Sequence, residues 1–159
     1  FREAEFARPL SHRNIVRTIG ICTAVPYIVS EYMANGSLKS YLMKKKASQK
    51  PLSKLEYLPI AQKIACAMAH LEKLGIVHRD LAARNVLVGV DHNCIKLADF
   101  GLARRVLDSG YYKASKGLFA YKWTAPEAWS AEAAQRGKFT SASDVWSFAV
   151  VLWELYSDG

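Results

Sequence analysis

The chain has 159 residues, of which 51% are hydrophobic and 23% are charged, a composition that is typical of a globular domain and excludes a disordered chain. The formal net charge is +8, but the positive residues are dispersed along the sequence, so we expect no nucleic-acid partner. The longest apolar run, residues 148–153, is too short to cross a bilayer, and we expect no membrane insertion within this chain. The three cysteines form no C-x-x-C pair, which indicates free thiols and a cytoplasmic location.

Hydrophobic spacing and turn residues predict the secondary structure in chain order. The expected elements are the end of a helix at 1–8 stopped by Pro9, strands at 15–21 and 27–29, a helix capped by Ser37, a long helix containing 61–71, short strands at 75–77, 86–88 and 95–98, and a fully buried helix at 142–156. Pro59 either kinks the long helix or marks its first turn. Residues Lys44–Lys46 end the helix that Ser37 starts, where we expect them to face solvent and favour the helix dipole rather than bind a ligand.

Three polar side chains follow short apolar strands. Asp80 and Asn85 lie five residues apart in a loop between two such strands, and Asp99 follows a third. Carboxylate and carboxamide oxygens are hard ligands that suit Mg²⁺. The set therefore fits magnesium-assisted phosphoryl transfer, in which one Asp accepts the proton of the substrate hydroxyl while the other Asp and the Asn hold the metal ions.

Residues 78–85 fit the pattern H-R-D-L-x-x-x-N, and Asp-Phe-Gly at 99–101 and Ala-Pro-Glu at 125–127 follow it in order. These motifs at this spacing resemble the protein kinases, and the resemblance covers the whole chain. It implies an α+β, protein-kinase-like fold that forms one partial kinase domain. Residues 1–31 would be a remnant of the β-rich small lobe and the start of the hinge, and residues 32–159 an incomplete, mainly helical large lobe.

The catalytic loop also resembles one branch of the family. It has Ala82 where serine/threonine kinases usually have lysine, and Arg84 supplies a cation instead. This L-A-A-R-N form and residues 122–127 resemble the tyrosine kinases, which implies transfer of the γ-phosphoryl group of ATP, with Mg²⁺, to tyrosines of protein substrates. The activation segment, residues 99–127, looks like that of focal-adhesion kinase, a non-receptor type.

The resemblance implies catalytic roles for individual residues. Asp80 would be the base, Asn85 and Asp99 would be the magnesium ligands, and Arg84 would steady the substrate hydroxyl and the phosphoryl group. Glu3, or as the alternative Glu5, would pair with a strand lysine which, like the Gly-rich phosphate loop, would lie upstream of this chain. We therefore expect the 159-residue chain alone not to catalyse, because positioning is most of this chemistry.

The segment from residue 28 to residue 33 resembles the kinase hinge, which binds the edge of the adenine. Glu31 and Met33 would contribute backbone contacts, and Ser30 would guard the pocket behind the adenine. Leu87 would form the floor of the adenine site. Met33 and Leu87 would also fit as ordinary core side chains.

Two tyrosines occupy a polar stretch of the activation segment. Tyr111 and Tyr112 lie where a mobile loop is expected, and phosphorylation would add nearly two negative charges there. The family match places Arg79 and Arg104 where they could bind that phosphate and pin the segment to the catalytic loop. We expect Tyr112 to be the better candidate and its phosphorylation to switch the parent enzyme on. Two partly buried loop tyrosines without this role are the alternative.

Four further residues have structural roles in the family. His78 and Phe100 would belong to a stack that couples the two lobes. Glu127 would meet an arginine, and Asp144 would bind the backbone of the catalytic loop, which explains an acidic group at the start of an apolar helix.

The sequence departs from the family at positions that bear on activity. Ala7 and Thr18 are smaller or more polar than the usual residues of the stack that couples the lobes, so its packing would be weaker. Ala120 and Tyr121 replace the usual residues of the loop that seats the target tyrosine. Two other classes stay open: a pseudokinase that binds partners without catalysis, and a nucleic-acid-binding domain with salt-dependent affinity.

Overall fold

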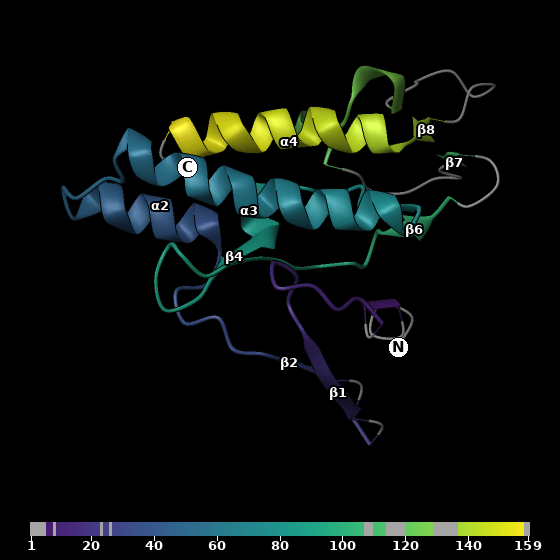
Figure 1. The fold of residues 1–159 in the computed structure, drawn as a ribbon, viewed down its shortest axis with the longest axis horizontal. Coiled ribbons are helices and arrows are strands. Elements are labelled where there is room, and N and C mark those ends of the chain that lie inside the picture. The colour runs from purple at the N-terminus through teal and green to yellow at the C-terminus, as the bar shows by residue number, and fades with distance from the viewer. Residues whose placement is uncertain are drawn as a thin grey trace.

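The computed structural model describes residues 6–7, 9–22, 24–25, 27–106, 110–113, 120–128 and 137–157. Within this part of the chain, three long helices form the body: α2 (Leu38–Ala47), α3 (Lys54–Lys73) and α4 (Ser141–Tyr156). Helix α3 packs against α4, and α2 contacts both α4 and the segment that precedes β4 (Figure 1). None of the described helices is long and apolar enough to pass through a bilayer.

Short strands pair in four two-stranded antiparallel sheets within the described residues. The pairs are β1 (Thr18–Cys22) with β2 (Tyr27–Ser30), β3 (Ile76–Val77) with β6 (Arg104–Arg105), β4 (Val86–Val88) with β5 (Ile95–Leu97), and β7 (Tyr112–Lys113) with β8 (Lys138–Phe139). Three 3₁₀ turns complete the set: η1 (Ala83–Asn85), η2 (Tyr121–Trp123) and η3 (Pro126–Ala128). The structure therefore combines a helical body with small sheets, as an α+β fold requires.

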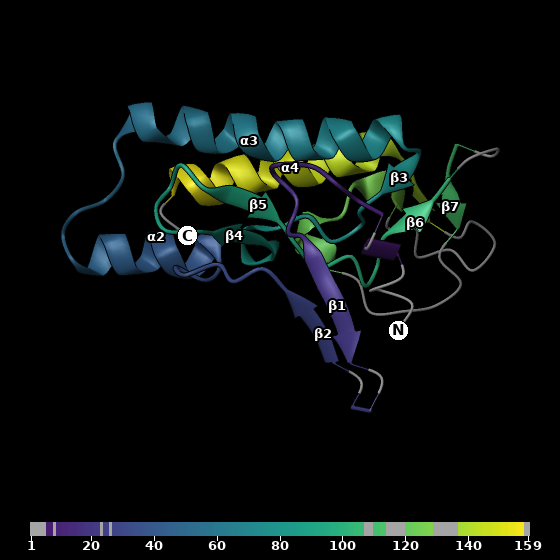
Figure 2. The same ribbon diagram turned by 60° about the horizontal axis from the view of Figure 1, so that its bottom comes forward.

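The hairpin β1–β2 projects from the helical body in both orientations (Figures 1 and 2). Its first strand begins at Thr18, later than the predicted Ile15, because the preceding residues bond to β5 instead. The N–H of Val16 donates to Leu97 O at 2.8 Å, and the N–H of Leu97 donates to Asn14 O at 2.8 Å. These bonds attach the hairpin to the body. Of the helix predicted at 1–8, residues 6 and 7 are helical and residues 1–5 and 8 lie outside the described part.

Helix α2 begins as predicted. Gly36 adopts a left-handed φ of 67° that suits glycine, and it closes the turn before the helix. The Ser37 hydroxyl then accepts the N–H of Ser40 at 3.2 Å, which caps the helix. The three lysines of residues 44–46 lie in the last turn, where they favour the helix dipole.

Helix α3 begins with a capping box between Ser53 and Glu56. Pro59 lies inside the helix, one turn beyond its start, so of the two predicted roles the first-turn position is wrong. Within the predicted helix Ile64 and Leu71 are buried, and Met68 between them is partly buried against the core. The i, i+3 and i+4 spacing of these side chains marks the buried face of α3.

The prediction that the last helix is fully buried is wrong. Helix α4 buries one face, which includes Val151 and Leu155, but Trp153 is 69% exposed and Val145 is 66% exposed. A helix that is hydrophobic all round needs partners on every side to be buried. In the described residues the packing partners of α4 are α2, α3 and the short elements β3, β8, η1 and η2, and they cover one side.

Candidate active site

A buried carboxylate at the start of α4 fixes the loop that follows β3. Asp144 is 5% exposed, and it accepts the N–H of His78 at 2.7 Å and the N–H of Arg79 at 3.0 Å. Burial raises the pKa of Asp144, and the nearby His78 and the two N–H donors act in the opposite direction. The loop backbone is therefore tied to the helical body at its first two residues.

A second buried carboxylate, which the sequence did not single out, holds the other end of the loop. Glu154 is 5% exposed, and its Oε2 accepts the N–H of Ala83 at 2.8 Å and the Nε1–H of Trp123 at 2.9 Å. The signal that could have found it is the one used for Asp144, an acidic residue within an apolar helix. Two carboxylates from one helix thus clamp the loop on both sides.

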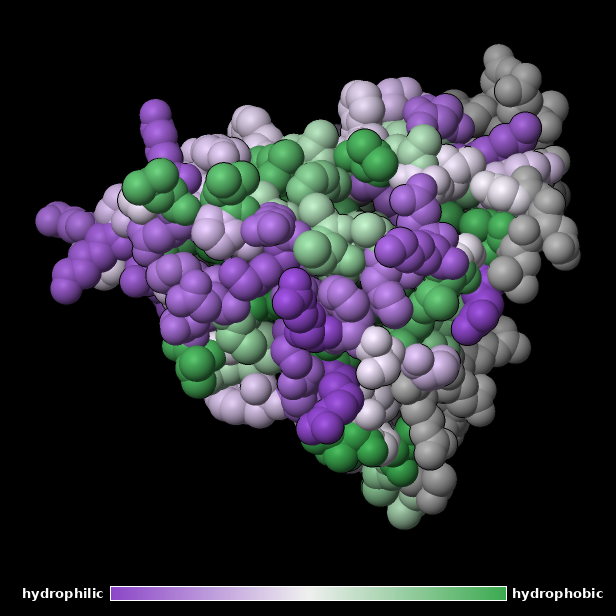
Figure 3. Space-filling view, viewed as in Figure 1, coloured by the Kyte–Doolittle hydropathy of each residue, from purple (hydrophilic) through white to green (hydrophobic). Residues whose placement is uncertain are grey.

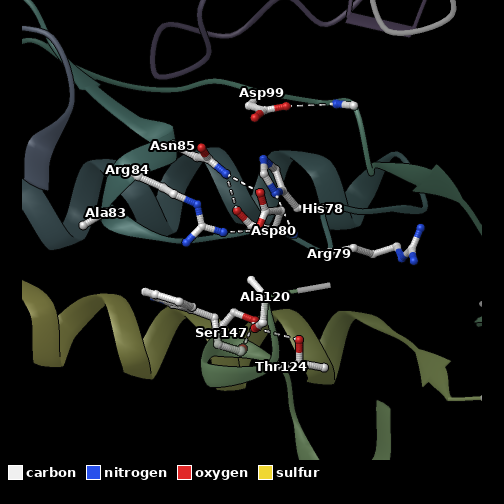
Figure 4. A network of polar contacts seen from close by, with 12 residues as sticks. His78, Arg79, Asp80, Ala83, Arg84, Asn85, Asp99, Ala120, Thr124 and Ser147 are labelled. Atoms are coloured by element: carbon white, nitrogen blue, oxygen red, sulfur yellow. Dashed lines mark hydrogen bonds and ion pairs between the residues drawn. The ribbon is translucent and has the colours of Figure 1, made fainter. Parts of the chain in front are cut away.

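The loop presents three polar side chains that contact one another (Figure 4). The Asp80 carboxylate is in close contact with Arg84 Nη2 through Oδ1. Its Oδ2 accepts Asn85 Nδ2 at 2.7 Å, and Nδ2 also donates to the Asp80 carbonyl at 2.7 Å. Arg84 stacks on Trp123 with its guanidinium carbon 4.6 Å from the ring centroid. Because the amide nitrogen of Asn85 is engaged with Asp80, its Oδ1 is the atom that could ligate a metal.

The β4–β5 hairpin brings Asp99 beside this loop. Val86 pairs with Leu97 in the register of the two strands, and the N–H of Ala98 donates to Asn85 O at 2.9 Å. Asp99 comes directly after Ala98, whose N–H is bonded to Asn85, and it faces the loop in Figure 4. It has a left-handed φ of 61°, and its exposed carboxylate accepts the N–H of Gly101 at 3.3 Å. The oxygens of Asn85 and Asp99 form a donor set that fits Mg²⁺.

His78 connects the loop to the segment of Asp99. Its ring is fully buried and packs edge-on against Phe100, with the ring centroids 5.3 Å apart. Nδ1 accepts the N–H of Asp80 at 3.3 Å, so Nε2 carries the proton and donates to Ala98 O at 3.3 Å. Burial lowers the pKa of His78, which keeps the ring neutral in this tautomer.

The predicted hinge residues lie at the end of β2 and just after it. Ser30 is exposed at the end of the strand and Met33 is buried. The hydrogen bonds of this segment use the Glu31 N–H and the Met33 C=O, while the Glu31 C=O and the Met33 N–H take no partner within the described residues. Leu87 is half-buried on β4 between two buried valines, so it points away from the core.

The Glu31 side chain has a role that the sequence did not predict. Both of its carboxylate oxygens lie 2.7 Å from Lys96 Nζ, and Oε1 also accepts the N–H of Arg17 at 2.7 Å. Burial on its own would raise the pKa of Glu31, but the bonds from Lys96 and Arg17 outweigh it and lower the pKa. This ion pair ties the segment after β2 to β5.

Arg79 and Arg104, the two arginines expected to bind a phosphate on the activation segment, both lie against the ring of Tyr112. The guanidinium carbon of Arg79 is 4.4 Å from the ring centroid of Tyr112, and that of Arg104 is 5.6 Å from it. Arg79 also lies 4.4 Å from the ring centroid of Phe139 on β8. Tyr111 instead carries Lys138 over its ring at 4.8 Å. Burial lowers the pKa of Arg79, as does Arg104, while Tyr112 opposes this change.

Two further site residues predicted from the sequence are Glu3 and Glu127. Glu3 lies outside the described residues. Glu127 is exposed on η3 and has no ion-pair partner among the described residues. The neighbouring loop is nevertheless held in place, because Ser147 Oγ donates to Trp123 O at 2.7 Å and Thr124 Oγ1 donates to Ala120 O at 3.0 Å.

Comparison with known proteins agrees with this geometry. The family described as protein tyrosine and serine/threonine kinase matches residues 1–159. The chain belongs to that family. The protein-kinase-like fold expected from the sequence follows from this membership, whereas the division into lobes at residue 31 stays a prediction.

Curated relatives lie within the same family. The chain is 42% identical to Tyrosine-protein kinase Abl of Drosophila melanogaster and 43% identical to Tyrosine-protein kinase abl-1 of Caenorhabditis elegans, over 99% of its own length in each case. It is 45% identical, again over 99% of its length, to Tyrosine-protein kinase transmembrane receptor Ror of Drosophila melanogaster. The chain spans 9%, 12% and 23% of the lengths of these three relatives, respectively. The similarity supports a tyrosine kinase catalytic domain, and the resemblance to focal-adhesion kinase stays a prediction.

Proposed function

We propose that the protein that carries this chain is a protein tyrosine kinase, which transfers the γ-phosphoryl group of ATP to tyrosine hydroxyls of protein substrates. The observation that supports this most directly is the arrangement of Asp80 between Arg84 and Asn85, with Asp99 beside them. The three relatives above are named tyrosine-protein kinases, which supports the choice of tyrosine as acceptor.

Each residue of the cluster has a definite task in this proposal. Asp80 accepts the proton of the substrate hydroxyl, and Asn85 holds its carboxylate in one orientation. Arg84, stacked on Trp123, steadies the hydroxyl and the phosphoryl group. Asn85 Oδ1 and the Asp99 carboxylate would hold Mg²⁺, which supplies charge neutralisation of the phosphates when bound.

The hinge and the activation segment complete the proposal. The Glu31 C=O and the Met33 N–H would meet the adenine edge over Leu87, with Ser30 at the pocket behind it. Phosphorylation of Tyr112 would place the phosphate near Arg79 and Arg104 and convert cation–π contacts into charge-assisted bonds. We also assign the parent protein to the non-receptor type in the cytoplasm, with an activation segment like that of focal-adhesion kinase.

The test compares catalysis with nucleotide binding in the full-length protein. Asp80→Asn should lower tyrosine-peptide phosphorylation about 10³-fold, because the general base is lost, while MgATP affinity and thermal stability stay close to those of the wild type. Asp91→Asn, in an exposed turn, is the matched control and should retain activity. A wild-type protein that binds nucleotide and phosphorylates no tyrosine peptide would instead be the pseudokinase considered above.

A further inference from the structure

A group of lysines gathers at the end of the molecule where α2 turns into α3. Three of them, residues 44–46, lie in the last turn of α2. Lys50 lies in the connecting segment, and Lys54 is the first residue of α3. All except Lys45 are exposed, and Lys45 lies over the Tyr41 ring at 5.5 Å from its centroid. We call this end of the molecule, residues 44–58, the lysine tip. The tip thus holds five of the 22 lysine and arginine residues of the chain.

The geometry of the lysine tip is fixed by its backbone. The N–H of Lys50 donates to Lys45 O at 3.0 Å, and the N–H of Gln49 donates to Lys46 O at 3.0 Å. Leu52 is buried in the main core and anchors the connecting segment. The acidic residue of the tip is already engaged, because Glu56 accepts the N–H and the hydroxyl of Ser53 at 2.7 Å and lies 3.4 Å from His92 Nε2. Five lysines and one glutamate leave the tip a net charge of +4.

Helix stabilisation explains only part of this charge. The lysines at the end of α2 favour its dipole, but Lys54 lies at the start of α3, where a positive charge is unfavourable. Two large apolar side chains follow it in the first turns of the helix: Leu55 is 86% exposed and Leu58 is 68% exposed, and Leu58 lies one turn from both Lys54 and Leu55. Figure 3 shows protruding hydrophilic side chains with hydrophobic side chains next to them at this end. Folding of the described residues gains little from either feature.

We propose that the lysine tip binds the surface of a membrane that contains anionic phospholipids. Flexible lysines attract anionic headgroups without fixed geometry, and exposed leucines next to them can enter the boundary between headgroups and acyl chains. A nucleic acid or an acidic polypeptide would satisfy the charges but would give no reason for two exposed leucines. The tip and the strands β7 and β8 lie at opposite ends of the molecule in Figures 1 and 2. A membrane at the tip therefore leaves the segment of Tyr111 and Tyr112 open.

The inference goes beyond the proposed kinase activity and is tested without it. The full-length protein is sedimented with phosphatidylcholine vesicles that contain about one-third phosphatidylserine, and with pure phosphatidylcholine vesicles as reference. The variant Lys44→Ala/Lys45→Ala/Lys46→Ala should bind the anionic vesicles on the order of 100-fold more weakly, because each lysine near such a surface strengthens binding roughly fivefold. Leu55→Ser/Leu58→Ser should weaken binding about tenfold and leave its salt dependence unchanged.

The matched control is the variant Arg13→Ala/Lys73→Ala/Arg105→Ala, which removes three exposed cations from other parts of the surface. It should bind the anionic vesicles as tightly as the wild type does. Equal losses in the control and in the lysine variant would overturn the proposal in favour of a general effect of net charge. Wild-type binding by the lysine variant, or equal binding to uncharged vesicles, would also overturn it. If the leucine variant binds normally and polyglutamate or duplex DNA displaces the vesicles, the tip recognises an acidic macromolecule instead. All variants change exposed residues except at Lys45, which is half-buried against Tyr41, and their melting temperatures should stay close to that of the wild type.

Discussion

The catalytic loop and the strand pair β7–β8 are both short, but different forces hold them. Residues 78–85 are clamped by two buried carboxylates of α4, which bond to backbone N–H groups near both ends of the loop. Tyr112 on β7 pairs with Phe139 on β8, packs partly buried against a small second hydrophobic cluster, and has two arginine side chains against its ring. Buried hydrogen-bonded charges are costly to disturb, whereas cation–π contacts at partly exposed positions contribute little. The loop is therefore built to stay in one geometry, whereas the contacts of Tyr112 with the two arginines are weaker.

The largest effect should come from breaking the clamp. Asp144→Ala leaves the buried N–H groups of His78 and Arg79 without an acceptor, which should lower the free energy of unfolding by about 3 kcal/mol and abolish activity. Glu154→Ala should act similarly through Ala83 and Trp123. Thermal and denaturant unfolding of the full-length protein measure the change.

Two variants sharpen this result. Asp144→Asn keeps one acceptor oxygen and should lie between the wild type and Asp144→Ala in stability. Glu72→Ala, which removes an exposed carboxylate from α3, should unfold like the wild type. If Asp144→Ala melts at the wild-type temperature, the loop does not depend on the clamp.

The strand pair should respond in activity rather than in stability. Tyr112→Phe retains the ring that packs on Arg79 but cannot be phosphorylated, so we expect about a tenfold loss of peptide phosphorylation with little change in melting temperature or nucleotide affinity. Arg104→Ala should remove most of the increase in kinase activity that phosphorylation of Tyr112 gives. Tyr27→Phe, on an exposed strand, is the matched control. Full activity in a variant with both Tyr111→Phe and Tyr112→Phe would show that this segment is not the switch.

The smallest effect concerns the ion pair between Glu31 and Lys96. Lys96→Met should cost about 0.5–1 kcal/mol of stability near neutral pH. Because the folded-state pKa of Glu31 is lowered from 4.5, the pair stabilises the protein above that value and its contribution is lost as the pH falls through the lowered pKa. The difference in stability between wild type and Lys96→Met should therefore disappear in acid. Lys63→Met, whose amine meets a carbonyl rather than a carboxylate, should show no such pH dependence.

The sequence by itself determined the features that depend on neighbours in the chain. Turn and capping residues such as Gly36 and Ser37 located the start of α2. Asp80, Asn85 and Asp99 could be assigned to one site because their side-chain chemistry suits magnesium and because their motifs resemble those of the protein kinases. The register of the β4–β5 hairpin then accounts for the position of Asp99 near Asn85. Local geometry is encoded by adjacent residues, so these predictions needed no knowledge of the rest of the fold.

The tertiary structure alone decided those distant contacts for which neither a local pattern nor the family resemblance gave a signal. Glu154 lies 71 residues from Ala83, and Lys96 lies 65 residues from Glu31, so no local pattern marks either pair. The one-sided burial of α4 also depends on which elements pack against it, which helix periodicity does not reveal when every face is apolar. The lysine tip combines the end of one helix with the start of another, and its charge became a single surface only because the connecting segment folds back tightly.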